Sequence, residues 1–413
     1  MSFRNTSSNS RSRTSRPGQG NNRSFGPPRH AQKSGGARRG AYIHPSKFIN
    51  KAVAPAEEIV YEAKHKFTDF ALSEALQQNI RDKGYTIPSA IQDQAIPFIL
   101  EGKDVIGLAN TGTGKTAAFA LPIIQNLDKH ALTPAVLIMA PTRELAQQID
   151  EQFRQYGKGL GFYSAICVGG MNIDRQIRDL RRKPHVIIGT PGRLKDLMKR
   201  NELKLDNITV VVLDEADRMM DMGFVDDMKM ILGLTPKSRQ TLFFSATITP
   251  SIQILVQQFL NNPETVSVRT AETSEHVEQD IIESPTKEAK LEILTEMLKA
   301  SEFEKVLVFG ETKFGVQRLS DHLEREGFTS AAIHGNKSQS QRQRALKAFK
   351  DNKVKILVAT DVAARGLDIP NVSHVINFDQ PASYEDYVHR IGRTGRGGAS
   401  GKAFTFVPTQ RNR

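Results

Sequence analysis

The chain has 413 residues, a length that allows two or three domains with well-buried cores. Its formal net charge is +12, and its single cysteine, Cys167, excludes an intrachain disulfide, so we expect a reducing, cytoplasmic compartment. The sequence has neither a run of about eighteen apolar residues nor an apolar N-terminal signal core, and we therefore expect no membrane span and no secretion.

The positive charge is concentrated in the N-terminal segment. Of the 57 Lys and Arg residues, eleven lie in residues 1–56, which contain no acidic residue. The rest of the chain therefore has 46 basic and 45 acidic residues and is nearly neutral. The first 50 or so residues are rich in Ser, Arg, Asn, Gly and Pro, a composition that predicts a disordered basic tail over 1–56. Spaced arginines with Gly and Phe25 favour loose contact with a phosphate backbone. A solubilising tail and an organelle transit peptide are the alternatives.

A glutamine and an aromatic residue lie close together after an amphipathic helix predicted at 72–80. Phe67 precedes this helix, and the run from Gly84 to Gln92 follows it. A Gln amide can pair with the edge of an adenine while a ring such as Tyr85 stacks on its face. A buried helix cap is the alternative, but the run lies about twenty residues before a phosphate-loop pattern.

That pattern is the segment Ala109–Thr116, between the apolar run 105–108 and a helical pattern at 117–121. Gly112 and Gly114 let backbone N–H groups turn toward an anion beside the positive end of a helix. Lys115 can reach β- and γ-phosphates, and Thr116 can bind magnesium. Ala109 replaces the first glycine of the general pattern, and a chance Gly-rich turn is the alternative.

An apolar run, Val210–Leu213, ends in three acids within four residues: Asp214, Glu215 and Asp217. Such a run predicts a parallel strand buried on both faces. The acids would then lie at its carboxyl end, where open α/β sheets bind ligands. One acid there can hold magnesium, and the next can orient or deprotonate a water. A solvated acidic turn is the alternative.

Strand and helix patterns alternate after the phosphate loop. Strands are predicted at 136–140, 165–168, 185–189, 208–213 and 241–244. Helices are predicted at 144–156, 175–181, 193–199, 225–232 and 251–260. This alternation predicts a doubly wound parallel sheet in a first domain over 57–270. Three strands end in residues suited to phosphate, and another ends in Ser245-Ala246-Thr247; the three are Pro141–Glu144, Gly169–Gly170 and Thr190–Arg193.

Residues 271–285 lack periodicity and are predicted to be a linker, followed by a second α/β domain over 286–413. Its strands are predicted at 306–309, 331–334, 356–359, 375–378 and 403–407. No second phosphate loop occurs. The polar motifs there are instead Gln339–Arg342, Thr360–Asp368 and His389–Arg396. In the last of these, Arg390, Arg393 and Arg396 recur at steps of three along one side of a helix end. They could form a solvated basic face, or their guanidinium groups could reach across a cleft to contact a γ-phosphate.

Taken together, these motifs make the chain resemble the DEAD-box ATP-dependent RNA helicases of superfamily 2, of the compact bacterial RhlE-like type. The resemblance covers roughly residues 65–410, with the motifs in the order of the family. Asn110 stands where the family often has Gln, and Phe309–Thr312 fits the family pattern only loosely. The resemblance implies two RecA-like parallel-sheet α/β domains in tandem.

The resemblance also implies roles for individual residues. ATP would be bound by Phe67, Tyr85, Gln92, Ala109, Asn110, Thr111, Gly112, Thr113, Gly114, Lys115, Thr116 and Asp368. Mg²⁺ would be held by Thr116 and by Asp214 through water. The catalytic residues would be Lys115, Asp214, Glu215, which activates the attacking water, and the arginine fingers Arg393 and Arg396. Residues coupling ATP state to domain closure would be Asp217, Ser245, Thr247 and His389. RNA would be bound by Pro141, Thr142, Arg143, Gly170, Thr190, Arg193, Arg342 and Thr360.

The mechanism implied is an ATP-gated clamp on RNA. ATP and single-stranded RNA together close the domains, closure bends the strand and locally opens a short duplex, and hydrolysis reopens the clamp. The residues predicted to bind RNA suit contact with sugar and phosphate, so binding is expected to be sequence-independent. The protein is expected to be a monomer. Ribosome assembly, mRNA decay and cold response are compatible targets. A DNA helicase on the same two domains and an RNA-binding scaffold with an inactive ATPase are the rival hypotheses.

Overall fold

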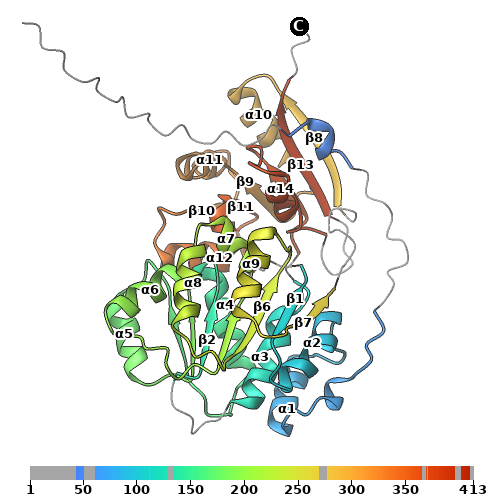
Figure 1. Cartoon of the computed structure of the whole chain (residues 1–413). Coiled ribbons are helices and arrows are strands. Elements are labelled where there is room, and N and C mark those ends of the chain that lie inside the picture. Colours follow the sequence, from blue (N-terminus) through green and yellow to red (C-terminus); the bar gives the residue numbers. More distant parts are fainter. Residues whose placement is uncertain are drawn as a thin grey trace, which may run out of the picture. The chain divides into compact units, whose positions relative to one another are not determined.

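The computed structural model describes residues 43–50, 61–110, 112–127, 134–268, 277–364, 369, 371–395 and 401–409. These residues build two parallel sheets with helices on both faces of each sheet (Figure 1). We call the part built on the seven-stranded sheet the first domain and the part built on the six-stranded sheet the second domain. The predicted fold class, two parallel-sheet α/β domains in tandem, is confirmed.

The first sheet has the strand order β3-β4-β2-β5-β6-β1-β7, and its neighbouring strands pair in parallel. Its strands are β1 (Val105–Leu108), β2 (Val136–Met139), β3 (Ser164–Cys167), β4 (Val186–Gly189), β5 (Val210–Leu213), β6 (Gln240–Ser245) and β7 (Glu264–Ser267). Every residue of β2 and β4 is buried, as unbroken apolar runs predict for central parallel strands.

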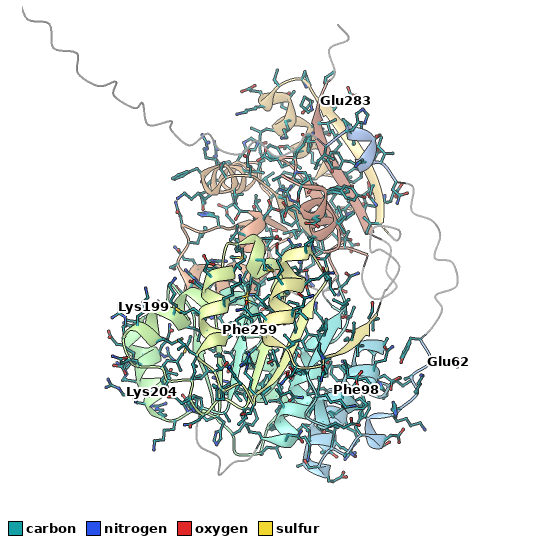
Figure 2. All side chains as sticks on the ribbon, in the orientation of Figure 1. Glu62, Phe98, Lys199, Lys204, Phe259 and Glu283 are labelled. Carbon is teal, nitrogen blue, oxygen red and sulfur yellow. The ribbon has the colours of Figure 1, made fainter. Side chains whose placement is uncertain are left out.

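The helices of the first domain cover the two faces of this sheet. They are α1 (Glu74–Asp82), α2 (Ala90–Leu100), α3 (Lys115–Asn126), α4 (Arg143–Tyr156), α5 (Ile173–Arg181), α6 (Pro191–Lys199), α7 (Ala216–Asp221), α8 (Val225–Gly233) and α9 (Pro250–Phe259). Successive residues of β2 enter opposite apolar layers: Ile138 packs with Phe119 and Phe153, and Leu137 with Leu194. Charged side chains such as Lys199 and Lys204 lie exposed on the outside (Figure 2).

The second sheet has the order β10-β11-β9-β12-β13-β8 and is also parallel. Its strands are β8 (Val277–Ser284), β9 (Val306–Phe309), β10 (Ser330–Ile333), β11 (Ile356–Ala359), β12 (His374–Asn377) and β13 (Gly401–Pro408). Its helices are α10 (Lys287–Met297), α11 (Lys313–Arg325), α12 (Gln339–Lys350), α13 (Asp361–Ala364) and α14 (Tyr384–Ile391). Within the described ranges, no helix combines the length and apolar character needed to cross a bilayer.

The predicted linker at 271–285 is wrong for residues 277–284. These residues form β8, which pairs with β13 from Val277↔Gly401 to Ser284↔Pro408 (Figure 1). Residues 278, 280 and 283 are exposed on this edge strand, while Val277 and Gln279 are buried. The acidic residues therefore lie on its outward face, and they obscured the strand in the sequence.

The predicted disordered tail is wrong for residues 43–50. A 3₁₀ helix, η1, spans Pro45–Phe48, and Asn50 forms an antiparallel bridge with Gln279 of β8. We call residues 43–50 the N-terminal arm. The other residues of the predicted tail, 1–42 and 51–56, lie outside the described residues.

Candidate functional site

The predicted site residues of the first domain lie along the carboxyl edge of its sheet, in two groups. The phosphate loop, the acidic turn and the segment 245–247 follow β1, β5 and β6, which are neighbours in the sheet. The residues predicted to bind RNA follow β2, β3 and β4, which are neighbours on the other side of β5. Parallel strands bring all of these loops to one edge, where α/β sheets bind ligands.

The phosphate loop turns through two glycines with left-handed backbone angles, φ 90° at Gly112 and 94° at Gly114. Gly114 also begins α3, so backbone N–H groups at the positive end of a helix lie in this turn. Lys115 is buried and its Nζ donates to the carbonyl oxygen of Ala109 at 2.8 Å. The hydroxyl of Thr113 donates to the carbonyl oxygen of Asn110 at 2.8 Å. The loop is thus closed on itself in a form suited to an anion; Thr111 lies outside the described residues.

Gln92 lies against this loop. Its Oε1 accepts from the backbone N–H of Ser89 at 3.0 Å, and its Nε2 donates to the carbonyl oxygen of Gly114 at 3.1 Å. The Ser89 hydroxyl donates to the carbonyl oxygen of Thr113 at 2.8 Å. A Cβ added at Gly114 would collide with the Gln92 amide. The amide retains one N–H and one lone pair beyond these bonds, enough to pair with a base edge.

The two aromatic residues predicted at the adenine pocket lie together. The rings of Phe67 and Tyr85 are nearly parallel, with centroids 6.4 Å apart and planes at 19°. Phe67 is buried, whereas Tyr85 is exposed and also lies 6.4 Å from the ring of Tyr156. Tyr85 therefore keeps part of its surface open to solvent, and the Lys83 ammonium lies 5.7 Å from the centre of its ring.

Asp93 makes structural contacts next to Gln92 that the sequence did not reveal. Its carboxylate accepts from the Tyr61 hydroxyl at 2.5 Å, from the backbone N–H groups of Lys64 and His65 at 2.8 and 3.1 Å, and contacts His65 Nδ1 at 2.7 Å. Burial alone would raise the pKa of Asp93, but these hydrogen bonds outweigh burial and lower it. Asp93 thereby fixes the segment leading into Phe67 to the helix that carries Gln92. Its partners lie 28 to 32 residues away in sequence, so no local pattern marks it.

The acidic turn after β5 places two buried carboxylates beside the loop. Glu215 has a left-handed φ of 51° and its N–H donates to Asp214 Oδ1 at 3.0 Å. A left-handed non-glycine residue costs about 1–3 kcal/mol, a strain typical of functional sites. Burial raises the pKa of Asp214 to about 7, against the opposing effect of the nearby Lys115 ammonium. The site is therefore short of positive charge, and a cation would stabilise it.

The donor set fits magnesium. Within the described residues, no group of three or more His, Cys, Asp or Glu side chains is arranged to hold a metal ion. Thr116 and Asp214 offer a hydroxyl and a carboxylate oxygen, the ligand type that Mg²⁺ prefers. Mg²⁺ commonly takes one or two protein ligands and completes its shell with substrate phosphates and water, so these two residues suffice.

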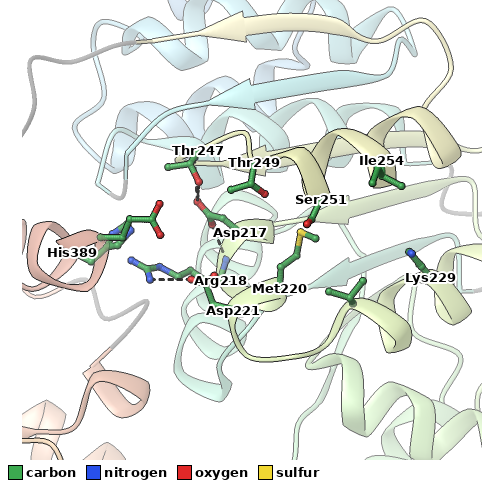
Figure 3. Close-up of a pocket in the computed structure, with 12 residues that line it drawn as sticks. Asp217, Arg218, Met220, Asp221, Lys229, Thr247, Thr249, Ser251, Ile254 and His389 are labelled. Atoms are coloured by element: carbon green, nitrogen blue, oxygen red, sulfur yellow. Dashed lines mark hydrogen bonds and ion pairs between the residues drawn. The ribbon is translucent and has the colours of Figure 1, made fainter. Parts of the chain in front are cut away.

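Asp217 joins the acidic turn to the end of β6. Its Oδ2 accepts from the N–H groups of Ala246 and Thr247 at 3.0 and 3.1 Å, and from the Thr247 hydroxyl at 3.3 Å. The Ser245 hydroxyl donates to the carbonyl oxygen of Thr247 at 2.8 Å. Asp217 and Thr247 line a pocket of about 450 Å³ together with His389 of α14 (Figure 3). The structure thus gathers all four residues predicted for coupling around one turn and its pocket.

Most residues predicted to bind RNA in the first domain lie at the ends of β2, β3 and β4. Thr142 caps α4 by accepting from Leu145 N–H at 3.2 Å, and Pro141 beside it is buried. The Arg143 guanidinium packs so closely on Gly170 that a Cβ there would collide with it. Thr190 begins α6, and Arg193 donates to the carbonyl oxygen of Met171 at 3.3 Å. This edge therefore combines guanidinium groups, a hydroxyl and a close approach of the backbone.

Arg342 lies in a buried ion pair, not on an open strand path. Its Nη2 donates to Glu144 Oε2 at 2.9 Å, and the two residues are 8% and 4% exposed. Gln339 Nε2 donates to the other oxygen of the same carboxylate at 3.1 Å. Burial, together with the charge of Arg342, lowers the pKa of Arg143. The RNA contact predicted for Arg342 therefore requires this ion pair to open; the sequence concealed it because its partners are 198 residues apart.

Arg390, the first arginine of its motif, is held inside the second domain. It is 2% exposed and forms a two-pronged ion pair with Asp361, with Nε–Oδ1 and Nη2–Oδ2 both at 2.6 Å. Its Nη1 donates to the carbonyl oxygen of Asp379 at 2.6 Å. Arg390 therefore anchors α14 within the second domain. Arg393 is buried just beyond this helix, and Thr360 directly follows β11. Arg396 and Asp368 lie outside the described residues.

Comparison with known proteins agrees with this geometry. Residues 89–255 match the family model of DEAD/DEAH box helicases, and residues 289–398 match that of the helicase conserved C-terminal domain. The chain is 47% identical over 343 residues to the ATP-dependent RNA helicase CshA of Limosilactobacillus reuteri, covering 83% of this chain and 69% of that protein. It is 46% identical to CshA of Geobacillus kaustophilus, covering 83% and 73%. It spans 66% of the CshA of Listeria monocytogenes.

Solved structures with the same fold carry RNA and nucleotide. S. cerevisiae Dbp5 bound to RNA and ADP BeF3 matches with a TM-score of 0.74 and 32% identity, covering 83% of this chain and 90% of that chain. Mss116p bound to ssRNA and AMP-PNP matches with a TM-score of 0.75 and 30% identity, covering 82% and 73%. With its phosphate loop, acidic turn and second domain matched to these proteins, the chain belongs to the DEAD-box ATP-dependent RNA helicases.

Proposed function

We propose that this chain is an RNA-stimulated ATPase that clamps single-stranded RNA while ATP is bound and locally opens short duplexes without moving processively along them. The observation that carries the proposal is the division of one sheet edge. Loops after β1, β5 and β6 carry phosphate-binding and acidic groups, and loops after β2, β3 and β4 carry guanidinium groups and hydroxyls. The proposed nucleotide surface and the proposed RNA surface adjoin at β2 and β5. Binding of a ligand to one surface can therefore change the conformation of the other.

The nucleotide half divides the chemistry among a few residues. Lys115, which now donates to Ala109, would turn its ammonium to the β- and γ-phosphates. Thr116 and Asp214 would hold Mg²⁺, which when bound neutralises phosphate charge. Glu215, which has a left-handed backbone, would accept a proton from the attacking water. Gln92, with one N–H and one lone pair left, would read the adenine edge.

The second domain would complete the site when the domains close. Arg393 and Arg396 are proposed to reach the γ-phosphate, and Asp368 the ribose. An arginine supplied in this way accelerates phosphoryl transfer by about 10³–10⁵, so hydrolysis should be slow without RNA. His389 lines the same pocket as Asp217 and Thr247, which supports a role in relaying the ATP state between the domains.

RNA binding is proposed to be independent of sequence. Pro141–Arg143, Gly170, Thr190 and Arg193 offer groups that suit phosphate and sugar oxygens, not base edges. Thr360 is proposed to continue the path on the second domain. Arg342 is proposed to join it after releasing Glu144.

The proposal also covers the oligomeric state, the location and the targets of the protein. A monomer is supported by the fact that one chain supplies both the phosphate loop and the arginine motif. A cytoplasmic location and the compact RhlE-like subgroup remain our predictions. Ribosomal or RNA-decay assemblies are the proposed targets, and crosslinking to cellular RNA followed by sequencing would identify them.

The test compares ATP hydrolysis by the full chain with no nucleic acid, with a single-stranded RNA, and with a DNA of the same sequence. We expect strong stimulation by RNA and little by DNA. Equal stimulation by DNA would favour a DNA helicase, and absence of hydrolysis with either would favour an RNA-binding scaffold. Lys115→Ala is the control, because it removes the phosphate-binding ammonium and should abolish any genuine signal.

A further inference from the structure

The N-terminal arm precedes the first domain in sequence but docks on the second domain. Phe48 is fully buried there, in the apolar layer that also contains Val277 and Tyr387. Its ring lies 4.7 Å from the ring of Tyr387, with the planes at 57°. Ile43 packs against the same layer. The arm thus contributes to the core of the second domain, although the whole first domain lies between the two in sequence.

Backbone pairing fixes the arm at the sheet edge. Asn50 N–H donates to the Gln279 carbonyl oxygen at 3.0 Å, and Gln279 N–H donates to the Asn50 carbonyl oxygen at 2.8 Å. β8 is the terminal strand of the second sheet, so the arm covers part of an otherwise open edge. The Gln279 side chain in turn accepts from the Tyr387 hydroxyl at 2.9 Å. Gln279 therefore connects the arm backbone to Tyr387 independently of Phe48.

Tyr387 lies on α14, the helix of the arginine motif. One turn further along the same face is Arg390, which the Asp361 ion pair holds. His389, on the same helix, lines the pocket with Asp217 and Thr247, and Arg393 follows the helix end. At the other end of α14, Asp386 lies 3.8 Å from Arg218 of the first domain. The arm therefore touches the element that presents the coupling and arginine-finger residues.

We propose that the N-terminal arm is a positioning element for α14, with Phe48 acting through Tyr387 to set the orientation from which Arg393 and His389 approach the nucleotide. The inference rests on the proposed function, because it assigns the arm to the ATPase step. Phe48 is a positioning residue and touches neither ATP nor RNA. Loss of its ring leaves a space beside Tyr387, into which α14 can tilt. Displacement of catalytic groups by about 1 Å can lower a rate by up to about 10²-fold.

The test uses the full chain with Phe48→Ala and two controls. Ile49→Ala truncates the neighbouring residue of the arm, which is 50% exposed. Phe303→Ala makes the same buried truncation in the other apolar layer of the second domain, beside His374. At a temperature where all variants are folded, Phe48→Ala should lower the RNA-stimulated kcat about tenfold with the KM for ATP unchanged. Both controls should keep the wild-type kcat.

A second experiment supplies the missing phenyl ring on a separate peptide. A peptide of residues 43–50, IHPSKFIN, added to the Phe48→Ala chain should bind the vacated site and recover kcat. The same peptide with Ala in place of Phe48 should not. Because all variants are folded at the assay temperature, recovery of kcat reports the position of α14 and not the amount of folded protein. If Phe48→Ala fails to fold, Asn50→Pro removes one of the two backbone hydrogen bonds and should give a smaller loss of the same kind.

The outcomes separate this inference from the proposed function. A wild-type kcat for Phe48→Ala, an equal loss for Phe303→Ala, or failure of the peptide to restore kcat would overturn the positioning role. Absence of RNA-stimulated hydrolysis in the wild type would instead refute the proposed function. In that case fluorescence anisotropy of the labelled peptide on the Phe48→Ala chain would still measure whether the arm docks.

Discussion

At the scale of single residues, the nucleotide site depends on side chains that have two tasks each. Gln92 closes the phosphate loop by bonding Ser89 and Gly114, and its remaining N–H and lone pair are left for a base. Glu215 lies just before α7 with a left-handed backbone, and its N–H donates to Asp214. Substitutions at such residues should therefore affect the geometry of the loop as well as the contact with the ligand.

Gln92→Ala should affect both nucleotide choice and nucleotide affinity. The wild type should prefer ATP to GTP, because a guanine edge would leave the amide mismatched at a cost of about 1–3 kcal/mol, which is a factor of about 5 to 150. The variant should lose much of this preference and also show a higher KM for ATP, because the bond to Gly114 is lost. RNA-stimulated kcat/KM with each nucleotide measures both effects. Equal use of GTP by the wild type would contradict the assignment of Gln92.

The sequence revealed residues whose chemistry shows in a local pattern. The glycines of the phosphate loop and the acids after Val210–Leu213 are of this kind, because a few neighbouring positions define them. Asp93 and Glu144 were missed, since their partners lie 28 or more residues away. The family resemblance implied an RNA contact for Arg342, but the sequence does not show that this residue is buried against Glu144.

At the scale of elements, α14 is held from three sides. Arg390 ties it to Asp361, Tyr387 ties it to Gln279 and Phe48, and Asp386 lies near Arg218. The Arg390 ion pair is enclosed, with side-chain exposures of 3% and 24%. Such an arrangement is costly to break on one side, because it leaves a charge without its partner in a poorly solvated place.

Asp361→Ala should lower the free energy of unfolding of the second domain by about 2–3 kcal/mol, since Arg390 keeps only its bonds to Asn377 and Asp379. Asp351→Ala is the matched control. Asp351 pairs with Lys347 at 3.8 Å on the surface, and its loss should cost under about 0.5 kcal/mol. Urea unfolding of both variants measures the difference. Equal stability of the two would show that the Arg390 pair does not anchor α14.

The predicted strands agree with the observed ones to within two residues at each end, and β9 and β11 agree without any shift, whereas α2 and β7 were not predicted. β8 and η1 were missed for a common physical reason. Each is a peripheral element whose stability comes from pairing with a distant part of the chain, β13 or β8. The sequence of β8 is too polar, and that of η1 too short, to predict a strand or a helix.

At the scale of the whole molecule, charge and catalysis occupy different parts of the chain. Nine of the eleven basic residues of 1–56 precede residue 41, and the body is nearly neutral. A basic segment tethered to an RNA-binding protein should add affinity by releasing counterions without contributing to chemistry. The arm at 43–50 belongs to the second domain, so a deletion that tests the tail has to stop before it.

Deletion of residues 1–40 should weaken RNA binding, most visibly at low salt, and leave the ATPase rate at saturating RNA unchanged. For every phosphate that the segment no longer neutralises, the slope of log K against log[salt] should become shallower by about 0.7. A salt titration of RNA affinity with and without the segment measures this. An unchanged slope would make the segment a solubility device, and a collapsed rate at saturating RNA would give it a part in domain closure.

We propose that ATP holds the domains closed on RNA until Glu215 allows hydrolysis. Glu215→Gln should keep the proposed magnesium ligands Thr116 and Asp214 but lose the proposed base, so single-turnover hydrolysis should fall by about 10²–10⁴-fold. The exposed Glu326→Gln is the control. The most direct measurement is the dissociation rate of labelled RNA from Glu215→Gln with ATP present. We predict much slower release than with ADP or with the control; release as fast as with ADP, or near-normal hydrolysis, would contradict the account.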